Sequence, residues 1–164
     1  MSGGHTAGVG AGEAEVRVVD PEHPDAVACL EAYYAELRRR DERGFDPTTG
    51  STALPHELRP PKGLIVVVYL HGEPVGCGAL KFHGEGVADI KRMWVADSVR
   101  GQGIGRRLLA SLESSAREHG VTLARLETNR NLVEAIALYE RNGYREVPAF
   151  NDEPYAHHWF AKAL

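Results

Sequence analysis

The segment of this sequence whose residue types best suit the binding of an anionic ligand contains three glycines within five positions, Gly101, Gly103 and Gly105. Glycine lets a backbone turn with positive φ and approach a ligand without a Cβ in the way. Successive N–H groups can then point into one concavity, and the start of a following helix adds about half a positive charge. Residues 100–106, with an arginine at each end, therefore predict a seat for a phosphate or pyrophosphate.

Two common phosphate-binding motifs do not fit this segment. A mononucleotide P-loop requires G-x-x-x-x-G-K-[ST], and no Lys with Ser or Thr follows Gly105. A dinucleotide fingerprint requires G-x-G-x-x-G, and Arg106 stands where its third glycine belongs. What remains is an R-x-x-G-x-G pattern between a strand-like run, 90–95, and an amphipathic helix that Ile104 opens. These residues alone leave open a plain glycine-rich turn that caps a helix.

Composition narrows the function classes. The chain has 164 residues and a formal net charge of −4, which gives no basic surface for nucleic acid, so we expect no nucleic-acid partner. No stretch approaches the ~20 apolar residues that cross a bilayer, so we expect no membrane partner. Cys29 and Cys77 lie in apolar contexts and are expected to be buried thiols in a reducing cytoplasm. No C-x-x-C or H-x-x-x-H pairing indicates a metal site.

The chain length suits one domain. Residues 1–12 are rich in Gly and Ala and predict a disordered tail ahead of a domain over 13–164. Apolar periodicity predicts the elements that position the glycine-rich segment. The expected helices begin near Asp25, Ile104 and Leu132, and the expected strands cover 15–20, 64–70, 75–82, 88–95, 121–128, 144–150 and 155–162. A long irregular stretch, 45–63, contains one short helical turn at 55–58.

Consecutive hairpin strands followed by strand–helix alternation predict an α/β fold, a mixed sheet with helices on both faces. This order and the R-x-x-G-x-G pattern resemble the GNAT superfamily of N-acetyltransferases, from about Glu15 to Leu164. The resemblance implies a mostly antiparallel central sheet that splays open between strands four and five. It also implies acetyl-CoA (coenzyme A) as co-substrate and no metal.

The resemblance assigns donor-binding roles to two segments. Met93, Trp94 and Val95, on the strand before the turn, would lie along the pantetheine arm, as an added strand pairs with a sheet edge. The pyrophosphate would be held by Arg100, Gly101, Gln102, Gly103, Ile104, Gly105 and Arg106. The family often has an asparagine seven residues before its helix tyrosine. In the family this asparagine contacts pantetheine; because Leu132 occupies the position here, we do not assign that contact to this chain.

Tyr139, in the segment 135–144 that resembles the second family signature, is the expected general acid. A phenol with a pKa of about 10 stays protonated at neutral pH and can give its proton to a departing thiolate. An amine acceptor also needs a base, because a lysine-like amine with a pKa of about 10.4 is mostly protonated. Asp89 and Glu127 are the candidate bases, acting through a water, and His83, His157 or His158 are alternatives.

The sequence therefore predicts an acetyl-CoA-dependent N-acetyltransferase that moves an acetyl group to a primary amine within a ternary complex. Residues 45–63 and 150–155 are expected to shape the acceptor site. Asp152 and Glu153 would attract an amine, whereas Lys91 or Arg92 could pair with a carboxylate, and the sequence leaves both readings open.

We expect a small-molecule amine or an amino acid as the acceptor. The alternatives are a peptide or protein amine, a non-catalytic acyl-CoA-binding sensor, and a nucleotide-dependent enzyme. The last strands offer an edge that could pair with a second copy as a homodimer.

Overall fold

The computed structural model describes residues 13–40 and 55–164. Seven strands form one sheet in the order β1-β2-β3-β4-β5-β7-β6. The bounds of the strands are Glu15–Val19 for β1, Gly63–Leu70 for β2, Glu73–Gly84 for β3, Val87–Val95 for β4, Leu123–Thr128 for β5, Arg145–Val147 for β6 and His158–Ala163 for β7. The predicted mixed α/β sheet is confirmed, since the β4–β5 pair is parallel and the other strand pairs of the described residues are antiparallel.

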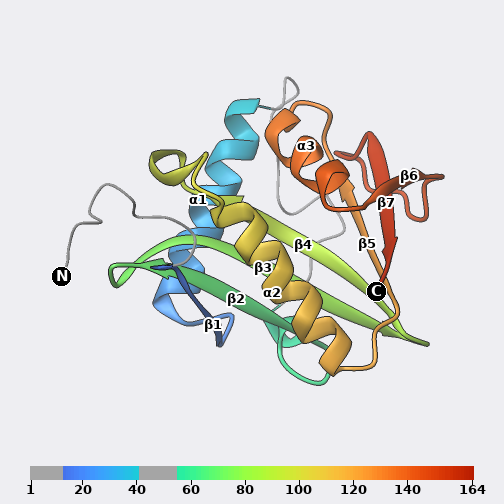
Figure 1. Cartoon of the computed structure of the whole chain (residues 1–164), viewed down its shortest axis with the longest axis horizontal. Coiled ribbons are helices and arrows are strands. Elements are labelled where there is room, and N and C mark those ends of the chain that lie inside the picture. Colours follow the sequence, from blue (N-terminus) through green and yellow to red (C-terminus); the bar gives the residue numbers. More distant parts are fainter. Residues whose placement is uncertain (1–12, 41–54) are drawn as a thin grey trace.

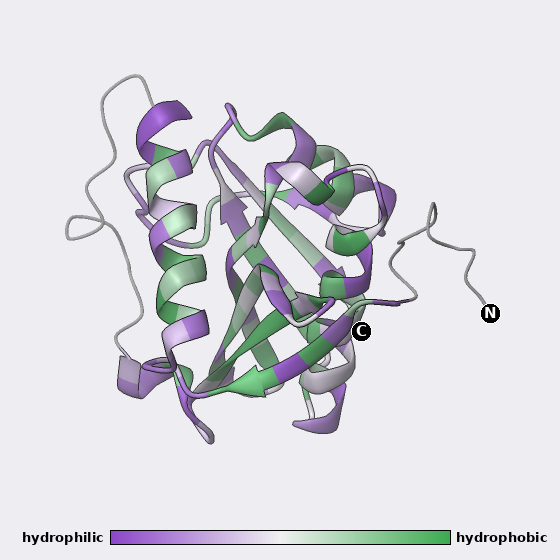
Figure 2. Cartoon of the chain, turned by 90° about the vertical axis from the view of Figure 1, so that its left-hand side faces the viewer, coloured by the Kyte–Doolittle hydropathy of each residue, from purple (hydrophilic) through white to green (hydrophobic). Residues whose placement is uncertain are grey.

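The described residues form helices α1, Pro24–Arg40, α2, Ile104–Glu118, and α3, Val133–Arg141, with short 3-10 turns η3, Pro55–Leu58, and η4, Asp97–Val99. Proline suits the first turn of α1, because its missing N–H has no partner there in any helix. Three arginines in the last turn complement the helix dipole. Figure 1 shows α2 crossing one face of the sheet with α1 behind the strands, and the turned view in Figure 2 shows helices on both sides.

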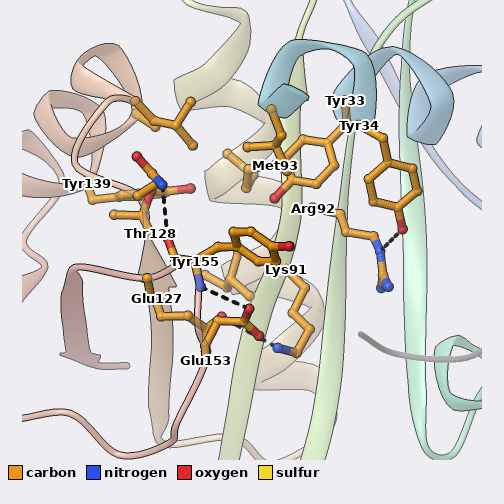
Figure 3. Close-up of a pocket in the computed structure, with 16 residues that line it drawn as sticks. Tyr33, Tyr34, Lys91, Arg92, Met93, Glu127, Thr128, Tyr139, Glu153 and Tyr155 are labelled. Atoms are coloured by element: carbon orange, nitrogen blue, oxygen red, sulfur yellow. Dashed lines mark hydrogen bonds and ion pairs between the residues drawn. The ribbon is translucent and has the colours of Figure 1, made fainter. Parts of the chain in front are cut away.

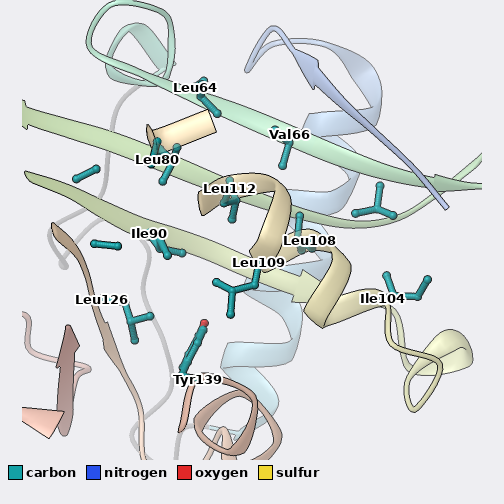
Figure 4. Close-up of a cluster of buried hydrophobic side chains, with 14 of the residues drawn as sticks. Leu64, Val66, Leu80, Ile90, Ile104, Leu108, Leu109, Leu112, Leu126 and Tyr139 are labelled. Carbon is teal, nitrogen blue, oxygen red and sulfur yellow. The ribbon is translucent and has the colours of Figure 1, made fainter. Parts of the chain in front are cut away.

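Strand β2 shows why a continuous apolar run folds as an interior strand of this sheet, between β1 and β3. Its alternate residues Leu64, Val66 and Val68 belong to the core under α2, as Figure 4 shows for the first two. Ile65, Val67 and Tyr69 belong to the second core, under α1, which also holds Cys29 and Cys77. Because both faces are covered, neither set of positions can be polar.

The sheet splits between β4 and β5, as predicted. Val87, Ala88 and Asp89 pair with Leu123, Ala124 and Arg125, and the register of pairs stops there. Beyond this point β4 continues to Val95 and β5 to Thr128 on diverging paths. One edge of β4 therefore faces an opening instead of a neighbouring strand.

A β-bulge lies in the part of β4 that borders the split. Cys77 pairs with Trp94 and Ala79 with Lys91, so Gly78 alone faces Arg92 and Met93. Arg92 has a φ of 56°, in the left-handed region that non-glycine residues rarely adopt. A Cβ at Gly78 would lie 2.7 Å from Leu112 Cδ1, so the strand opposite the bulge packs closely against α2 at this glycine.

The last strands differ from the sequence-based bounds. The segment expected at 144–150 is a strand only over Arg145–Val147, and the final strand begins at His158 instead of position 155. Residues 155–157 instead run as irregular backbone, with His157 N–H donating to the carbonyl of Thr128. The predicted tail at 1–12 and the first part, 45–54, of the irregular stretch predicted at 45–63 lie outside the described residues. Within the described ranges, no helix is long and apolar enough to span a bilayer.

Candidate active site

The glycine-rich turn folds as an open cradle at the start of α2. Gly101 and Gly103 both have a φ of 81°, and Gly103 is the residue that precedes the first turn of the helix. No side chain caps this helix end among the described residues, so its first N–H groups face outward. Gly105 is helical, and a Cβ there would lie 3.2 Å from Leu138 Cδ2 on α3. The turn is therefore both a potential anion seat and a close packing point.

The two arginines that flank the turn differ in their surroundings. Arg100 donates from Nε to the carbonyl of Val95 at 3.0 Å and from Nη2 to Glu36 Oε1 at 2.6 Å, and it also pairs with Asp97. Its guanidinium thus anchors the turn to β4 and α1 and is balanced by two carboxylates. Arg106 is exposed and lies in the first turn of α2, which leaves it the better placed cation for an anionic ligand.

A cavity of about 670 Å³, here called the larger cavity, runs from this turn into the split of the sheet. Its walls come from α1, β4, the turn and α3. Nine of the ten residues expected to bind the donor line it: Met93, Trp94, Val95, Arg100, Gly101, Gly103, Ile104, Gly105 and Arg106. Gln102 is exposed and is not among them.

A second cavity of about 110 Å³, here called the smaller cavity, lies beside the larger cavity and is lined by residues of both β4 and β5 (Figure 3). Four tyrosines line it, Tyr33 and Tyr34 from α1, Tyr139 from α3, and Tyr155 from the loop before β7. Four charged residues join them: Lys91, Arg92, Glu127 and Glu153. Because Tyr33, Met93 and Tyr139 line both cavities, the two spaces meet at these side chains.

Tyr139 is buried, with 5% of its surface exposed, and its ring packs edge-on against that of Tyr144. Burial, with a smaller contribution from the Glu127 carboxylate, raises the pKa of Tyr139 well above its usual value. The hydroxyl is therefore a neutral proton donor at neutral pH. Burial likewise raises the pKa of Tyr33, which faces the same junction.

Glu127 lies on β5 beyond the last residue paired with β4, and its side chain is 10% exposed. Its Oε1 accepts from Asn151 Nδ2 at 2.6 Å, and its Oε2 lies 3.5 Å from Lys91 Nζ across the split. The Trp159 indole N–H in turn donates to Asn151 Oδ1 at 2.9 Å, which fixes the amide so that it presents N–H to Glu127. The carboxylate is thus held at the cavity wall.

Asp89, the other candidate base, does not reach either cavity. It is 3% exposed and lies where β4 and β5 are still paired, opposite Arg125. Arg125 Nε donates to Oδ1 at 2.9 Å, and His83 Nε2 lies 2.7 Å from Oδ2. The structure therefore separates Asp89 from Tyr139 and Glu127, and it places Asp89 in a structural ion-pair cluster.

The three histidines considered as alternative bases also lie outside the residues that line the smaller cavity. His83 contacts Asp89, and His158 lies 2.8 Å from Glu146. His157 accepts at Nδ1 from the N–H of Arg130 at 3.1 Å. No group of three or more His, Cys, Asp or Glu suited to a metal ion occurs in the described ranges.

Sequence reasoning missed the contribution of α1 to the site. Tyr33 and Tyr34 read as parts of an amphipathic helix, and nothing in their spacing shows that the end of α1 overlies the split. The expected turn at 150–155 does contribute Glu153 and Tyr155 to the smaller cavity, whereas Asp152 is exposed.

The comparisons with known proteins agree with this geometry. The family model described as "Acetyltransferase (GNAT) family" matches residues 28–144. The IAA acetyltransferase of Azospirillum brasilense is 38% identical over 94 residues, 57% of this chain and 61% of that protein. The aminoalkylphosphonate N-acetyltransferase of Salmonella typhimurium is 34% identical over 99 residues, 57% of this chain and 58% of that protein. The matched segment thus spans about three fifths of these relatives.

The structural similarity to a solved protein covers more of the chain than the sequence matches do. The crystal structure of a Klebsiella pneumoniae protein, assigned there as an acyl-CoA N-acyltransferase, is 30% identical with a TM-score of 0.74. The superposition covers 92% of this chain and 97% of that one.

Proposed function

The chain belongs to the GNAT family of acetyltransferases, and from this premise we propose that it transfers an acetyl group from acetyl-CoA to the primary amine of a small molecule. One observation carries the proposal: the larger and the smaller cavity meet at Met93 and Tyr139, inside the split between β4 and β5. A thioester that enters along one cavity can therefore meet an amine that enters along the other. Two free, buried cysteines suit a reducing cytoplasm as its location.

The larger cavity is the proposed site of the donor. The outward N–H groups at the start of α2 and the exposed cation of Arg106 suit the pyrophosphate. The unpaired edge of β4 suits the two amides of pantetheine, which can hydrogen-bond as an added strand does. This arrangement would bring the thioester to Met93, whose N–H is a candidate donor to the carbonyl oxygen as negative charge develops there.

The reaction we propose is a direct transfer. The amine nitrogen attacks the thioester carbon, a C–N bond forms, and the C–S bond breaks. Glu127, through a water, takes the proton that the amine loses, and Tyr139 gives a proton to the departing sulfur. Burial keeps the Tyr139 hydroxyl protonated at neutral pH, as a proton donor must be, and its place at the junction of the two cavities is what supports this role.

Incubation with acetyl-CoA and a panel of amines tests the proposal, with free thiol and acetylated product measured together. We expect both to appear in equal amounts with at least one small amine. Binding of acetyl-CoA without thiol release would favour a non-catalytic sensor. Acetylation of peptides or proteins alone would show that the acceptor is not a small molecule. A rise in melting temperature with ATP or NAD but not with acetyl-CoA would overturn the proposal.

A further inference from the structure

The Glu127 carboxylate belongs to a bridge of side chains across two strands. Glu127 on β5 and Trp159 on β7 are directly opposite each other in an antiparallel pair, so their side chains leave the sheet on the same face. Asn151, on the segment between β6 and β7, connects them. The Trp159 indole N–H donates to Asn151 Oδ1 at 2.9 Å, and Asn151 Nδ2 donates to Glu127 Oε1 at 2.6 Å.

The orientation of the Asn151 amide follows from its partners. An indole nitrogen can only donate, so the atom of Asn151 that faces Trp159 must be its oxygen. The backbone N–H of Glu153 donates to the same oxygen at 3.2 Å. The other end of the amide is therefore the NH₂ group, and it faces the Glu127 carboxylate, which accepts hydrogen bonds when it is ionised. These partners allow the amide one orientation.

The segment that carries Asn151 is itself attached to β5. The preceding residue, Phe150, places its ring against the Arg125 guanidinium, with Cζ 4.2 Å from the ring centroid. Arg125 and Glu127 are two positions apart on the strand and so share a face. Two consecutive residues of the segment thus contact neighbouring positions on one face of β5. The amide that binds Glu127 is therefore preorganised, which favours a reaction that depends on exact placement.

The hydrogen bond from Asn151 affects both the direction and the charge of Glu127. With Oε1 held by the amide, Oε2 lies 3.5 Å from Lys91 Nζ across the split, where the residue lines the smaller cavity. A donor to a carboxylate also favours its ionised form, which is the form that a general base requires. Neither Asn151 nor Trp159 lines either cavity, so any effect on the reaction must pass through Glu127.

We propose that Asn151 is a positioning residue of the reaction, whose amide keeps Glu127 ionised and directed into the smaller cavity. There Glu127, through a water, takes the proton that the amine loses. Trp159 supports this role by fixing the amide of Asn151. The inference rests on the proposed function and adds to it two residues that do not touch the substrate.

Asn151→Leu tests the role with a side chain of similar size that has no N–H to donate. At saturating acetyl-CoA and amine, kcat for thiol release should fall about 10- to 100-fold, since a hydrogen bond to a charged group contributes about that factor. The Kd for acetyl-CoA should not change. The acid limb of the kcat profile should move to higher pH by about one unit or more, because the ionised carboxylate has lost a donor.

The acid limb must be assigned to Glu127, because other ionisable groups face it across the smaller cavity. They are Lys91 and Arg92 on β4, Glu153 on the loop before β7, Tyr33 on α1 and Tyr139 on α3. Ordinary Lys, Arg and Tyr side chains titrate at about pH 10 or above, so an acid limb reports a carboxylate. Glu127→Gln should abolish the limb, and a limb that persists in this variant would overturn the inference.

A double variant separates positioning from general support of the fold. In the Glu127→Gln background, Asn151→Leu should lower kcat no further, because the residue on which Asn151 acts is already lost. The same proportional fall in both backgrounds would show that Asn151 acts independently of Glu127, and would overturn the inference.

The matched control is Tyr69→Phe, which also removes a 2.6 Å hydrogen bond to a carboxylate, that of Asp25. This variant should leave kcat and its pH profile unchanged. If Asn151→Leu does not fold, Trp159→Phe decides, since it removes the indole N–H and keeps an aromatic ring. It should cause a smaller fall in kcat with an acid limb displaced in the same direction, and an unchanged rate and profile would overturn the inference.

The outcomes distinguish the inference from the function on which it rests. Unchanged kcat and pH profile in folded Asn151→Leu would overturn the role of Asn151 and leave the acetyltransferase intact. Unchanged kcat in Glu127→Gln would remove the base and, with it, the inference. Absence of thiol release from the unaltered protein with every amine would overturn the proposed function as well.

Discussion

Glu36 Oε1 accepts a hydrogen bond from Arg100 Nη2 at 2.6 Å, across 64 positions of sequence. Glu36 is 8% exposed, and its second oxygen lies 3.3 Å from Arg40 Nε. Arg40 in turn pairs with Glu134, in the first turn of α3, at 2.7 Å. A chain of ion pairs thus ties the glycine-rich turn to α1 and α3 around the larger cavity.

The two arginines of the turn should therefore respond differently to substitution. Arg100→Met leaves the Glu36 carboxylate with one partner fewer in a poorly exposed site, so we expect a loss of about 1–3 kcal/mol in the free energy of unfolding. Arg106→Met should leave the melting temperature unchanged and weaken acetyl-CoA binding several-fold, by about 1 kcal/mol. Denaturant melts and calorimetry of acetyl-CoA binding measure the two effects, and a reversed pattern would show that Arg100 is the phosphate ligand.

Replacement of Tyr139 by Phe tests the proposed acid. Loss of a general acid lowers kcat by about 10²-fold or more, whereas the aromatic packing of the ring survives in Phe. The matched control is Tyr69→Phe, which removes a phenol on the α1 side of the sheet, bonded at 2.6 Å to Asp25 Oδ2. That control should retain kcat. Steady-state kinetics of thiol release distinguish the variants, and an unimpaired Tyr139→Phe enzyme would remove the acid from the mechanism.

Asp89 is buried and Glu127 is largely so, and substitution of the two carboxylates should affect different properties of the protein. We expect Glu127→Gln to lower kcat by about 10²-fold, since it removes the proposed base. Asp89→Asn breaks the ion pair with Arg125, whose side chain is 25% exposed, and should cost about 1–3 kcal/mol of stability. The folded fraction of that variant should keep its kcat per active site. Titration of the acetyl-CoA binding sites, together with the measured rate, gives the kcat per active site. A lower kcat per active site in Asp89→Asn but not in Glu127→Gln would identify Asp89 as the base.

The alkaline limit of stability should depend on Tyr69. Burial, and then the hydrogen bond to Asp25, raise the pKa of Tyr69 to about 12, whereas an unfolded tyrosine has a pKa of about 10. The folded protein thus retains a proton that the unfolded chain releases in this interval. The stabilisation is fully present below pH 10 and is lost as pH rises from 10 through 12. Urea melts over this range should show a shallower decline for Tyr69→Phe than for the unaltered protein, and identical slopes would contradict the shift.

The sequence predicts most elements of this fold because their apolar patterns are local. The run 64–70 is apolar throughout, and β2 is covered on both faces; Gly120 follows the end of α2, as predicted. The register in which β4 pairs with β5, however, is not determined by local sequence. Whether Asp89 or Glu127 reaches the split depends on where the pairing of β4 with β5 stops, and no residue type in the sequence indicates that point.

The same distinction applies to the site: the parts that depend on local sequence could be predicted, and the parts that depend on distant contacts could not. The backbone chemistry of the glycine-rich turn follows from residues 100–106 themselves. In contrast, the partner of Arg100 lies on α1, and Gly78, opposite the bulge of β4, packs closely against Leu112 of α2. Contacts of this kind arise only from packing between distant segments, so the surroundings of Arg100 and the position of the paired tyrosines of α1 required the folded structure.

Only three residue pairs join β4 to β5, so the sheet consists of two leaves with a short shared seam. Lys91 belongs to one leaf and Glu127 to the other. The width of the space between the leaves is consequently set by how far they diverge beyond Asp89, as well as by the side chains they carry. Relatives that keep both residues but open the seam at another angle would thus have a site of a different width.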